Sequence, residues 1–383
     1  MPLPLMDYNE LEQKMTDAVT KEIGQVEALR KEVRKLRVRK LGYRPCKTIA
    51  TIATDAGENR LTFEPLNLEI IRVVDSEGRE LVTEVIAISE DDSIFRELTT
   101  KLPVMRNLLN QLGINFENLS YLLGRKKAKN TEKVADNRGR VKAYRDILEW
   151  AVLLDLARQS WPVDILLLRD GLLRTKSIKR ETFPKLDTAF RRIHEEQMRG
   201  GKKKVYILGV AKSSAVLSKL GLALIFEGIF DRNYPCYAEI PPDLEAQCYN
   251  FDRTWLETTS EQQIEGRQLY QSFGRLHLVK LSSMSDGSVF PVDVPVWLSP
   301  DKKQEILEYL VYDSSETFPT IGYPAALQRA HENAVLTGFE MTVLGDLMTE
   351  ALKGNTDKKF IERLVRHIHL GKSLTKGGAR KGG

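Results

Sequence analysis

Cysteine is scarce in this 383-residue sequence, with only Cys46, Cys236 and Cys248. Their spacing fits neither a zinc motif nor a disulfide framework, which excludes a small disulfide-stapled domain and a zinc-finger protein. A reducing cytoplasm is therefore the expected setting.

Long apolar runs are also missing. The longest, near Leu217–Phe230, contains Lys219 and Glu227 and is too short and too charged to cross a bilayer. The opening residues, MPLPLMDYNE, have no basic segment followed by an apolar one, so we expect no signal peptide. We therefore expect no membrane partner.

A complete phosphate-loop motif is absent as well. Leu208-Gly209-Val210-Ala211-Lys212-Ser213-Ser214 lacks the paired glycines of G-x-x-x-x-G-K-[ST], which excludes ATP binding there. Lys212 remains a candidate to hold a phosphate group as a point charge, or an ordinary surface lysine.

What is present is an ordinary globular composition with clustered positive charge. Hydrophobic residues make up 42% of the chain, charged residues 29%, and the formal net charge is +5. This composition supports a packed core and permits a polyanionic partner without requiring one. Basic residues cluster at Arg30–Lys40, Arg125–Lys133, Arg174–Arg180, Lys202–Lys204 and Lys372–Lys381. Solvated surfaces explain such clusters equally well.

Apolar periodicity predicts one α/β sheet with an antiparallel half and a parallel half. The expected strands are Thr48–Thr54, Leu66–Val74, Thr83–Ile88, Val163–Leu168, Lys204–Val210, Pro235–Ile240, Arg275–Ser282 and Val289–Trp297. The expected helices are Tyr8–Arg37, Ser93–Leu112, Val141–Gln159, Phe183–Met198, Asp301–Tyr312, Pro324–Thr337, Met341–Lys353 and Asp357–Gly371. The segment Gly124–Arg140 is expected to be an exposed loop.

Three acidic residues stand out because of their apolar surroundings. Asp55 and Asp170 each end an apolar strand and are followed closely by glycine, a pattern typical of ligand sites and equally of simple turns. Glu149 is the one carboxylate in Ile147–Leu154, where burial demands a partner: a metal ion, or Arg145 one turn earlier. If the two strands are neighbours, the three carboxylates converge. Mg²⁺ and Mn²⁺ favour oxygen ligands, and two such ions can assist phosphodiester cleavage.

The carboxyl-terminal part adds two candidates. Pro324 is expected at the first position of a helix, with Tyr323 just before it and His331 two turns further along. A histidine facing the acids binds metal or shuttles a proton, and a tyrosine donates to phosphate. An ordinary amphipathic helix with a half-buried histidine is the alternative.

Taken in order, these segments resemble the NurA family of nucleases. The stretches that carry the resemblance are Thr51–Gly57, the helix around Glu149, Asp164–Leu173, Leu208–Ser214, Phe290–Pro295 and Gly322–Leu336. No single motif is specific, whereas their order and spacing are. One departure lies at the first acid, where family members usually have Asp-Gly-Ser and this chain has Asp55-Ala56-Gly57.

The resemblance implies an α/β, RNase H-like mixed sheet flanked by helices, with a long N-terminal helix and a helical C-terminal region. It implies that Asp55, Glu149, Asp170 and His331 are metal ligands. Tyr323 matches a family tyrosine and Lys212 a family Lys-Ser/Thr segment, while Asp293 receives no catalytic role. The expected organisation is a helical arm over 1–42, a nuclease domain over 43–340, helices over 341–371 and a basic, disordered tail over 372–383.

The resemblance also implies a function. Members of this family are similar in depending on Mn²⁺ or Mg²⁺, in forming homodimers and in working with a hexameric HerA-type ATPase. They degrade single- and double-stranded DNA ends during double-strand break repair, often with 5′ to 3′ polarity. Two alternatives stay open: a catalytically weak DNA-binding or adaptor subunit on a degenerate nuclease fold, and another RNase H-like nuclease, acting in phage defence or on RNA.

Overall fold

The computed structural model describes residues 8–43, 49–63, 66–87, 93–123, 137–201, 203–249, 272–315, 317–318 and 320–355. Cys46, Arg125–Lys133, Lys202, the predicted helix Asp357–Gly371 and the predicted tail lie outside these residues. Within the described part, no helix combines the length and apolar character needed to traverse a bilayer.

The core of the molecule is a mixed sheet in the order β1-β7-β8-β9-β6-β5-β2-β3-β4. Its strands are β1 (Arg39–Lys40), β2 (Ile49–Phe63), β3 (Leu66–Asp75), β4 (Glu80–Ala87), β5 (Asp164–Asp170), β6 (Val205–Val210), β7 (Cys236–Glu239), β8 (Gly274–Lys280) and β9 (Val289–Pro295). Strands β2, β3 and β4 form an antiparallel meander, whereas β5 and β6 run parallel to β2. This arrangement confirms the predicted α/β mixed sheet, with an antiparallel half and a parallel half.

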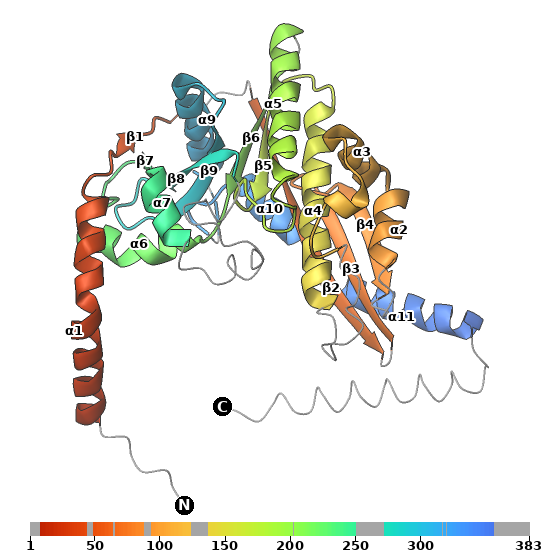
Figure 1. Cartoon of the computed structure of the whole chain (residues 1–383), viewed down its shortest axis with the longest axis horizontal. Coiled ribbons are helices and arrows are strands. Elements are labelled where there is room, and N and C mark those ends of the chain that lie inside the picture. The colour runs from red at the N-terminus through yellow and green to blue at the C-terminus, as the bar shows by residue number, and fades with distance from the viewer. Residues whose placement is uncertain are drawn as a thin grey trace, which may run out of the picture.

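Helices cover both faces of the sheet (Figure 1). They are α1 (Tyr8–Val33), α2 (Ile94–Lys101), α3 (Pro103–Leu112), α4 (Asn137–Arg158), α5 (Phe183–Arg199), α6 (Ala215–Phe226), α7 (Pro242–Tyr249), α9 (Pro300–Asp313), α10 (Ala325–Ala334) and α11 (Gly338–Asn355). Helices α2 to α5 pack on one face of the meander and of β5 and β6. Helices α9 and α10 pack on the opposite face.

Alternation along the strands decides which side chain meets which layer. Leu167 of β5 joins the core under α4 and α5, whereas Leu166 and Leu168 join the core under α9 and α10. The same rule assigns Arg169 to the α4 face and Asp170 to the α10 face. Two consecutive charged residues are thereby sent to opposite sides of the sheet.

Several boundaries differ from the sequence-based prediction. Strand β2 does not end at Thr54: it continues to Phe63, because its polar second half pairs with β3 through Phe63↔Leu66. Asp55 therefore lies within a strand, and only its parallel pairing with β5 stops there. The polar residues Glu58, Asn59, Arg60 and Thr62 hid this continuation, since the prediction relied on an apolar run.

Other differences concern helices. The predicted helix Ser93–Leu112 is two helices, because Pro103 begins α3 and cannot continue the helix before it. Helix α4 begins at Asn137, inside the segment predicted as a loop. Helices α6 and α7 had no counterpart in the prediction.

Candidate metal centre

Two neighbouring parallel strands bring the first two acids together. The pairing of β2 with β5 ends at Thr54↔Arg169, so Asp55 and Asp170 are the next residues on each strand. By the alternation of side chains along each strand, both point to the face of the sheet that α10 covers. The convergence expected from the sequence therefore arises, although Asp55 is not at a strand end.

Helix α10 adds a histidine to the two acids. Nδ1 of His331 lies 2.8 Å from Oδ2 of Asp55, and one ligand atom from each of Asp55, Asp170 and His331 lies within 4.8 Å of the other two. The backbone N–H of Ala56 donates to the other Asp55 oxygen over 2.7 Å, which fixes the carboxylate. His331 is half exposed, so the cluster is open to solvent on that side.

A glycine allows this approach. A Cβ built on Gly57 would lie 2.1 Å from the carbonyl oxygen of Ala334 at the end of α10. Only glycine lets β2 and α10 pack this closely. The Asp55-Ala56-Gly57 stretch is regular strand, with Ala56 paired to Val73. With Asp55-Ala56-Gly57 in place of Asp-Gly-Ser, the glycine thus lies where α10 crosses β2.

Tyr323 and Lys212 surround the second acid. The Tyr323 hydroxyl donates to Oδ1 of Asp170 over 3.3 Å, and Lys212 Nζ lies 3.9 Å from Oδ2. Burial and the nearby charge of Asp55 raise the pKa of Asp170, against the opposing charges of Lys212 and His331. Burial and Asp170 also raise the pKa of Tyr323, so this phenol remains a donor.

Glu149 stands outside the three-residue cluster. Its Oε2 lies 3.3 Å from Nη2 of Arg169, on the α4 face of the sheet, and its side chain is almost fully buried. The partner expected from helix spacing, Arg145, instead lies 3.6 Å from Glu58. Burial raises the pKa of Glu149 to about 8, although Arg169 opposes the shift.

Arg169 is the charge partner of Glu149 that the sequence-based prediction missed. Its guanidinium contacts Asp146, donates to the carbonyl of Leu172 over 2.7 Å and stacks 4.6 Å from the ring of Trp150. The signal was available, because Arg169 follows Ile165–Leu168 just as Glu149 interrupts an apolar helix. Two isolated charges in neighbouring apolar elements predict a buried pair.

A second cluster of buried charges, formed by Arg174, Asp293 and Glu245, holds parts of the fold together. Arg174 Nε donates to Asp293 Oδ2 over 2.8 Å, and the same guanidinium contacts Glu245. All three side chains are at most 5% exposed. Arg174, the first residue of one predicted basic run, is therefore not available to a phosphate backbone. Asp293, which received no catalytic role from the sequence, holds β9 to this arginine.

The donor set fits a hard divalent cation. Two carboxylates supply the oxygen ligands typical of Mn²⁺ and Mg²⁺ sites, the imidazole adds a nitrogen ligand of the kind that transition-metal ions accept, and close carboxylates are stabilised by a cation between them. Among the described residues, the Asp55–Asp170–His331 group is the one that could hold a metal. Oε1 of Glu149, on the α4 face, is buried without a hydrogen-bond partner, and, besides burial, the charges of Asp55 and Asp170 contribute to raising the pKa of this residue.

Comparison with known proteins gives one family match. A family model described as the NurA domain matches residues 78–336, which include Glu149, Asp170, Lys212, Tyr323 and His331 and exclude Asp55. None of the curated proteins compared with the chain matches it.

Solved structures also resemble this chain. The NurA nuclease from Sulfolobus solfataricus is 13% identical, with a TM-score of 0.46 over 93% of this chain and 99% of that one. A NurA bound to dAMP and manganese is 11% identical, with a TM-score of 0.36 over 87% and 94%. Endonuclease V of Ciona intestinalis in complex with inosine-containing DNA is 11% identical, with a TM-score of 0.26 over 85% and 98%.

Proposed function

The chain belongs to the NurA family, and from that premise we propose that it is a metal-dependent nuclease that hydrolyses phosphodiester bonds of DNA. The observation that carries this proposal is the convergence of Asp55, Asp170 and His331 from three distant segments of the chain. Two partly buried carboxylates this close together repel each other unless a cation lies between them.

We propose that Asp55, Asp170 and His331 hold Mn²⁺ or Mg²⁺. Such an ion polarises the phosphate and lowers the pKa of a bound water. Glu149 is the natural ligand of a second ion, because one of its oxygens is unpaired and the other makes only a long contact with Arg169.

The protein's own residues supply orientation and charge. Tyr323 donates to Asp170 and thereby holds that carboxylate toward Asp55. Lys212 is half exposed and lies beside Asp170, so it meets an incoming phosphate as a point charge. His331 lies on the open side, where it completes the ligand set or positions the attacking water.

Family membership supports a wider setting. We propose that the chain acts as a homodimer with a HerA-type hexameric ATPase in DNA end resection, with the arm over 1–42 available for partner contacts. The phosphate-loop motif is absent from the sequence, so translocation along DNA must be supplied by that partner. Co-purification with a HerA-type ATPase and stimulation of cleavage by ATP would test this setting.

The nuclease proposal is tested with Asp170→Asn and Asp55→Asn, which keep side-chain size and remove a ligand charge. We expect Mn²⁺-dependent cleavage of end-labelled single- and double-stranded DNA to fall roughly a hundredfold or more, since even outer-shell partners of a metal contribute about 10–100-fold. Asp346→Asn, at an exposed position of α11, is the matched control and should keep full activity.

Cleavage by purified protein that survives both substitutions would overturn the proposal. Absence of Mn²⁺-dependent cleavage in the unsubstituted protein, with DNA binding retained, would instead establish the adaptor alternative. Cleavage of RNA in preference to DNA would redirect the substrate assignment.

A further inference from the structure

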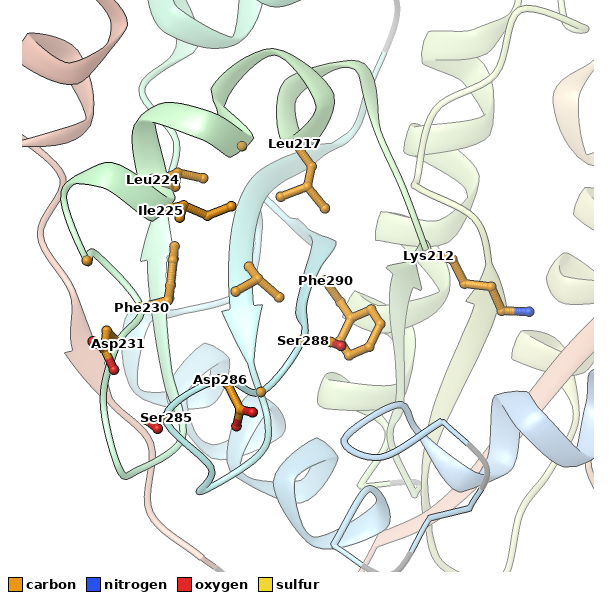
Figure 2. Close-up of a pocket in the computed structure, with 14 residues that line it drawn as sticks. Lys212, Leu217, Leu224, Ile225, Phe230, Asp231, Ser285, Asp286, Ser288 and Phe290 are labelled. Carbon is orange, nitrogen blue, oxygen red and sulfur yellow. The ribbon is translucent and has the colours of Figure 1, made fainter. Parts of the chain in front are cut away.

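A groove runs beneath α6, and Lys212 lies at one end of it (Figure 2). It is a cavity of about 870 Å³ between α6, the turn after it and the segment 285–290. Lys212 lines it, and Lys212 also lies 3.9 Å from Asp170. Lys212 is therefore shared by the groove and by the surroundings of Asp170.

One face of α6 forms its apolar wall. Leu217, Gly221, Leu224 and Ile225 recur at helical spacing and all line the groove, with Phe230 and Phe290 among its other walls. Ile225 is 73% exposed although it is a large apolar residue. The ring of Phe290 packs 5.1 Å from that of Tyr323, whose hydroxyl holds Asp170, so the apolar wall reaches the metal centre.

Gly221 is unusual in this wall. It lies in the interior of α6, where glycine destabilises a helix, yet an added Cβ would meet no atom within 4 Å. Packing therefore does not require glycine at this position. A larger side chain here would extend into the groove, so the glycine keeps the groove open.

Charge along the groove is polarised. Lys212 lies on one side of the groove and Asp231 on the other, with apolar side chains between them, and Asp286 is a second carboxylate (Figure 2). A ligand that fits has an anionic group at one end, a flat apolar body, and N–H donors for the carboxylates. A nucleotide unit with an amino-bearing base has these three parts.

We propose that this groove is a base-binding subsite that receives an unstacked base of the strand whose phosphate lies at Lys212 and the metal centre. This inference rests on the proposed nuclease function and names its substrate class. Apolar and aromatic walls bind the flat faces of bases. The acceptable substrate is then a strand whose bases are unpaired beside the scissile phosphate, and a duplex is acceptable only after its end has opened.

The test fills the groove without disturbing the core. Gly221→Leu places a side chain into open space, and Gly24→Leu does the same in the interior of α1, away from the groove. Full-length proteins are assayed with Mn²⁺ on a single-stranded oligonucleotide, on the same strand with abasic residues, and on bis(p-nitrophenyl) phosphate, which has no base.

We expect Gly221→Leu to raise KM for the oligonucleotide roughly tenfold or more relative to its effect on the small diester, the scale of one lost base contact. The unsubstituted protein should prefer the normal strand to the abasic strand, and Gly221→Leu should abolish this preference. Gly24→Leu should match the unsubstituted protein on every substrate.

Equal treatment of normal and abasic strands by the unsubstituted protein, or unchanged oligonucleotide kinetics in Gly221→Leu, would overturn the subsite. The groove would then suit an apolar segment of a partner protein. If the unsubstituted protein cleaves none of the three substrates, the nuclease proposal fails by itself. Equilibrium binding of the normal and abasic strands to both proteins then decides the subsite: weaker binding of the abasic strand supports it, and equal binding overturns it.

Discussion

At the scale of single residues, the alternation of side chains along β5 explains why neighbouring charged residues lie on opposite faces of the sheet at the candidate metal centre. Asp170 faces α10 and joins Asp55 and His331, whereas Arg169 faces α4 and pairs with Glu149. The same strand thus supplies a proposed metal ligand on one face and a counter-charge for Glu149 on the other. Glu149 is held on the side of the arginine, with one oxygen unsatisfied.

The state of Glu149 can be measured through pH. Burial raises its pKa from 4.5 to about 8, so the folded protein favours the protonated form. Stability from this group is therefore present below the ordinary carboxyl pKa and is lost as pH rises through about 8. Urea unfolding is measured at a series of pH values with a metal chelator present. Between about pH 4.5 and 8, the free energy of unfolding of the unsubstituted protein should fall relative to that of Glu149→Gln. Glu12→Gln, at an exposed position of α1, is the control and should show the same pH dependence of stability as the unsubstituted protein. Parallel curves of stability against pH for all three proteins would contradict the raised pKa of Glu149.

Tyr323 gives a second prediction at this scale. Tyr323→Phe keeps the buried ring beside Phe290 and removes the hydroxyl that donates to Asp170. We expect the fold to be retained and Mn²⁺-dependent kcat to fall by roughly tenfold, the equivalent of one hydrogen bond of about 1.4 kcal/mol. Steady-state kinetics with circular dichroism as a folding check measure this. An unchanged kcat would show that Asp170 needs no such donor.

At the scale of elements, the crossing of α10 over β2 sets the distance between His331 and Asp55. Gly57→Ala would drive a Cβ against the carbonyl of Ala334, 2.1 Å away. We expect a loss of about 1–3 kcal/mol in the free energy of unfolding, as for other overpacked sites, together with weaker Mn²⁺ binding. Urea titration and calorimetry measure the two effects.

Gly24→Ala is the control for this substitution, because nothing lies within 4 Å of its Cβ position. It should stabilise α1 by up to about 1 kcal/mol. Normal Mn²⁺ binding by a stable Gly57→Ala protein would mean that α10 can shift without moving His331.

The attachment of α1 depends on Glu227 at the end of α6. This carboxylate accepts from Nε of both Arg30 and Arg34, each over 2.5 Å, and is only 12% exposed. The two arginines lower its pKa to about 2, so the contact is fully present above the ordinary carboxyl pKa and is lost as pH falls toward about 2.

Glu227→Gln should release α1 while leaving cleavage of small diesters intact, because the metal centre lies on other elements. Faster hydrogen exchange within Tyr8–Val33 would report the release. Glu32→Gln removes an exposed pair between the last turn of α1 and Lys35, just beyond the helix, and should leave exchange unchanged. Equal exchange in both variants would assign the attachment to apolar packing instead.

At the scale of the whole molecule, the sequence was sufficient for every strand of the sheet except the short β1, because apolar runs mark strands. It was also sufficient for the meeting of Asp55 with Asp170, because each acid directly follows an apolar run and the two runs pair in parallel. It was insufficient where contacts depend on the third dimension. The partner of Glu149 is Arg169 of another element, not Arg145 of its own helix. The continuation of β2 beyond Asp55 was hidden because Glu58, Asn59, Arg60 and Thr62 interrupt the apolar run on which the prediction relied. The groove beneath α6 was not foreseen, since α6 itself was not predicted.

Because the three cluster residues come from β2, β5 and α10, a bound cation would tie distant parts of the chain together. Ligands that bind only the folded state stabilise it by about 2.7 kcal/mol at one hundred times Kd. We therefore expect Mn²⁺ to raise the melting temperature of the unsubstituted protein and of Asp346→Asn, but not that of Asp170→Asn. Equal shifts in all three would place the cation elsewhere.

The most direct test of the metal centre is anomalous diffraction at the manganese edge from crystals grown with Mn²⁺. A peak within coordination distance of Asp55, Asp170 and His331 is the predicted result. Manganese bound elsewhere, with these three side chains left as they are without metal, would contradict it.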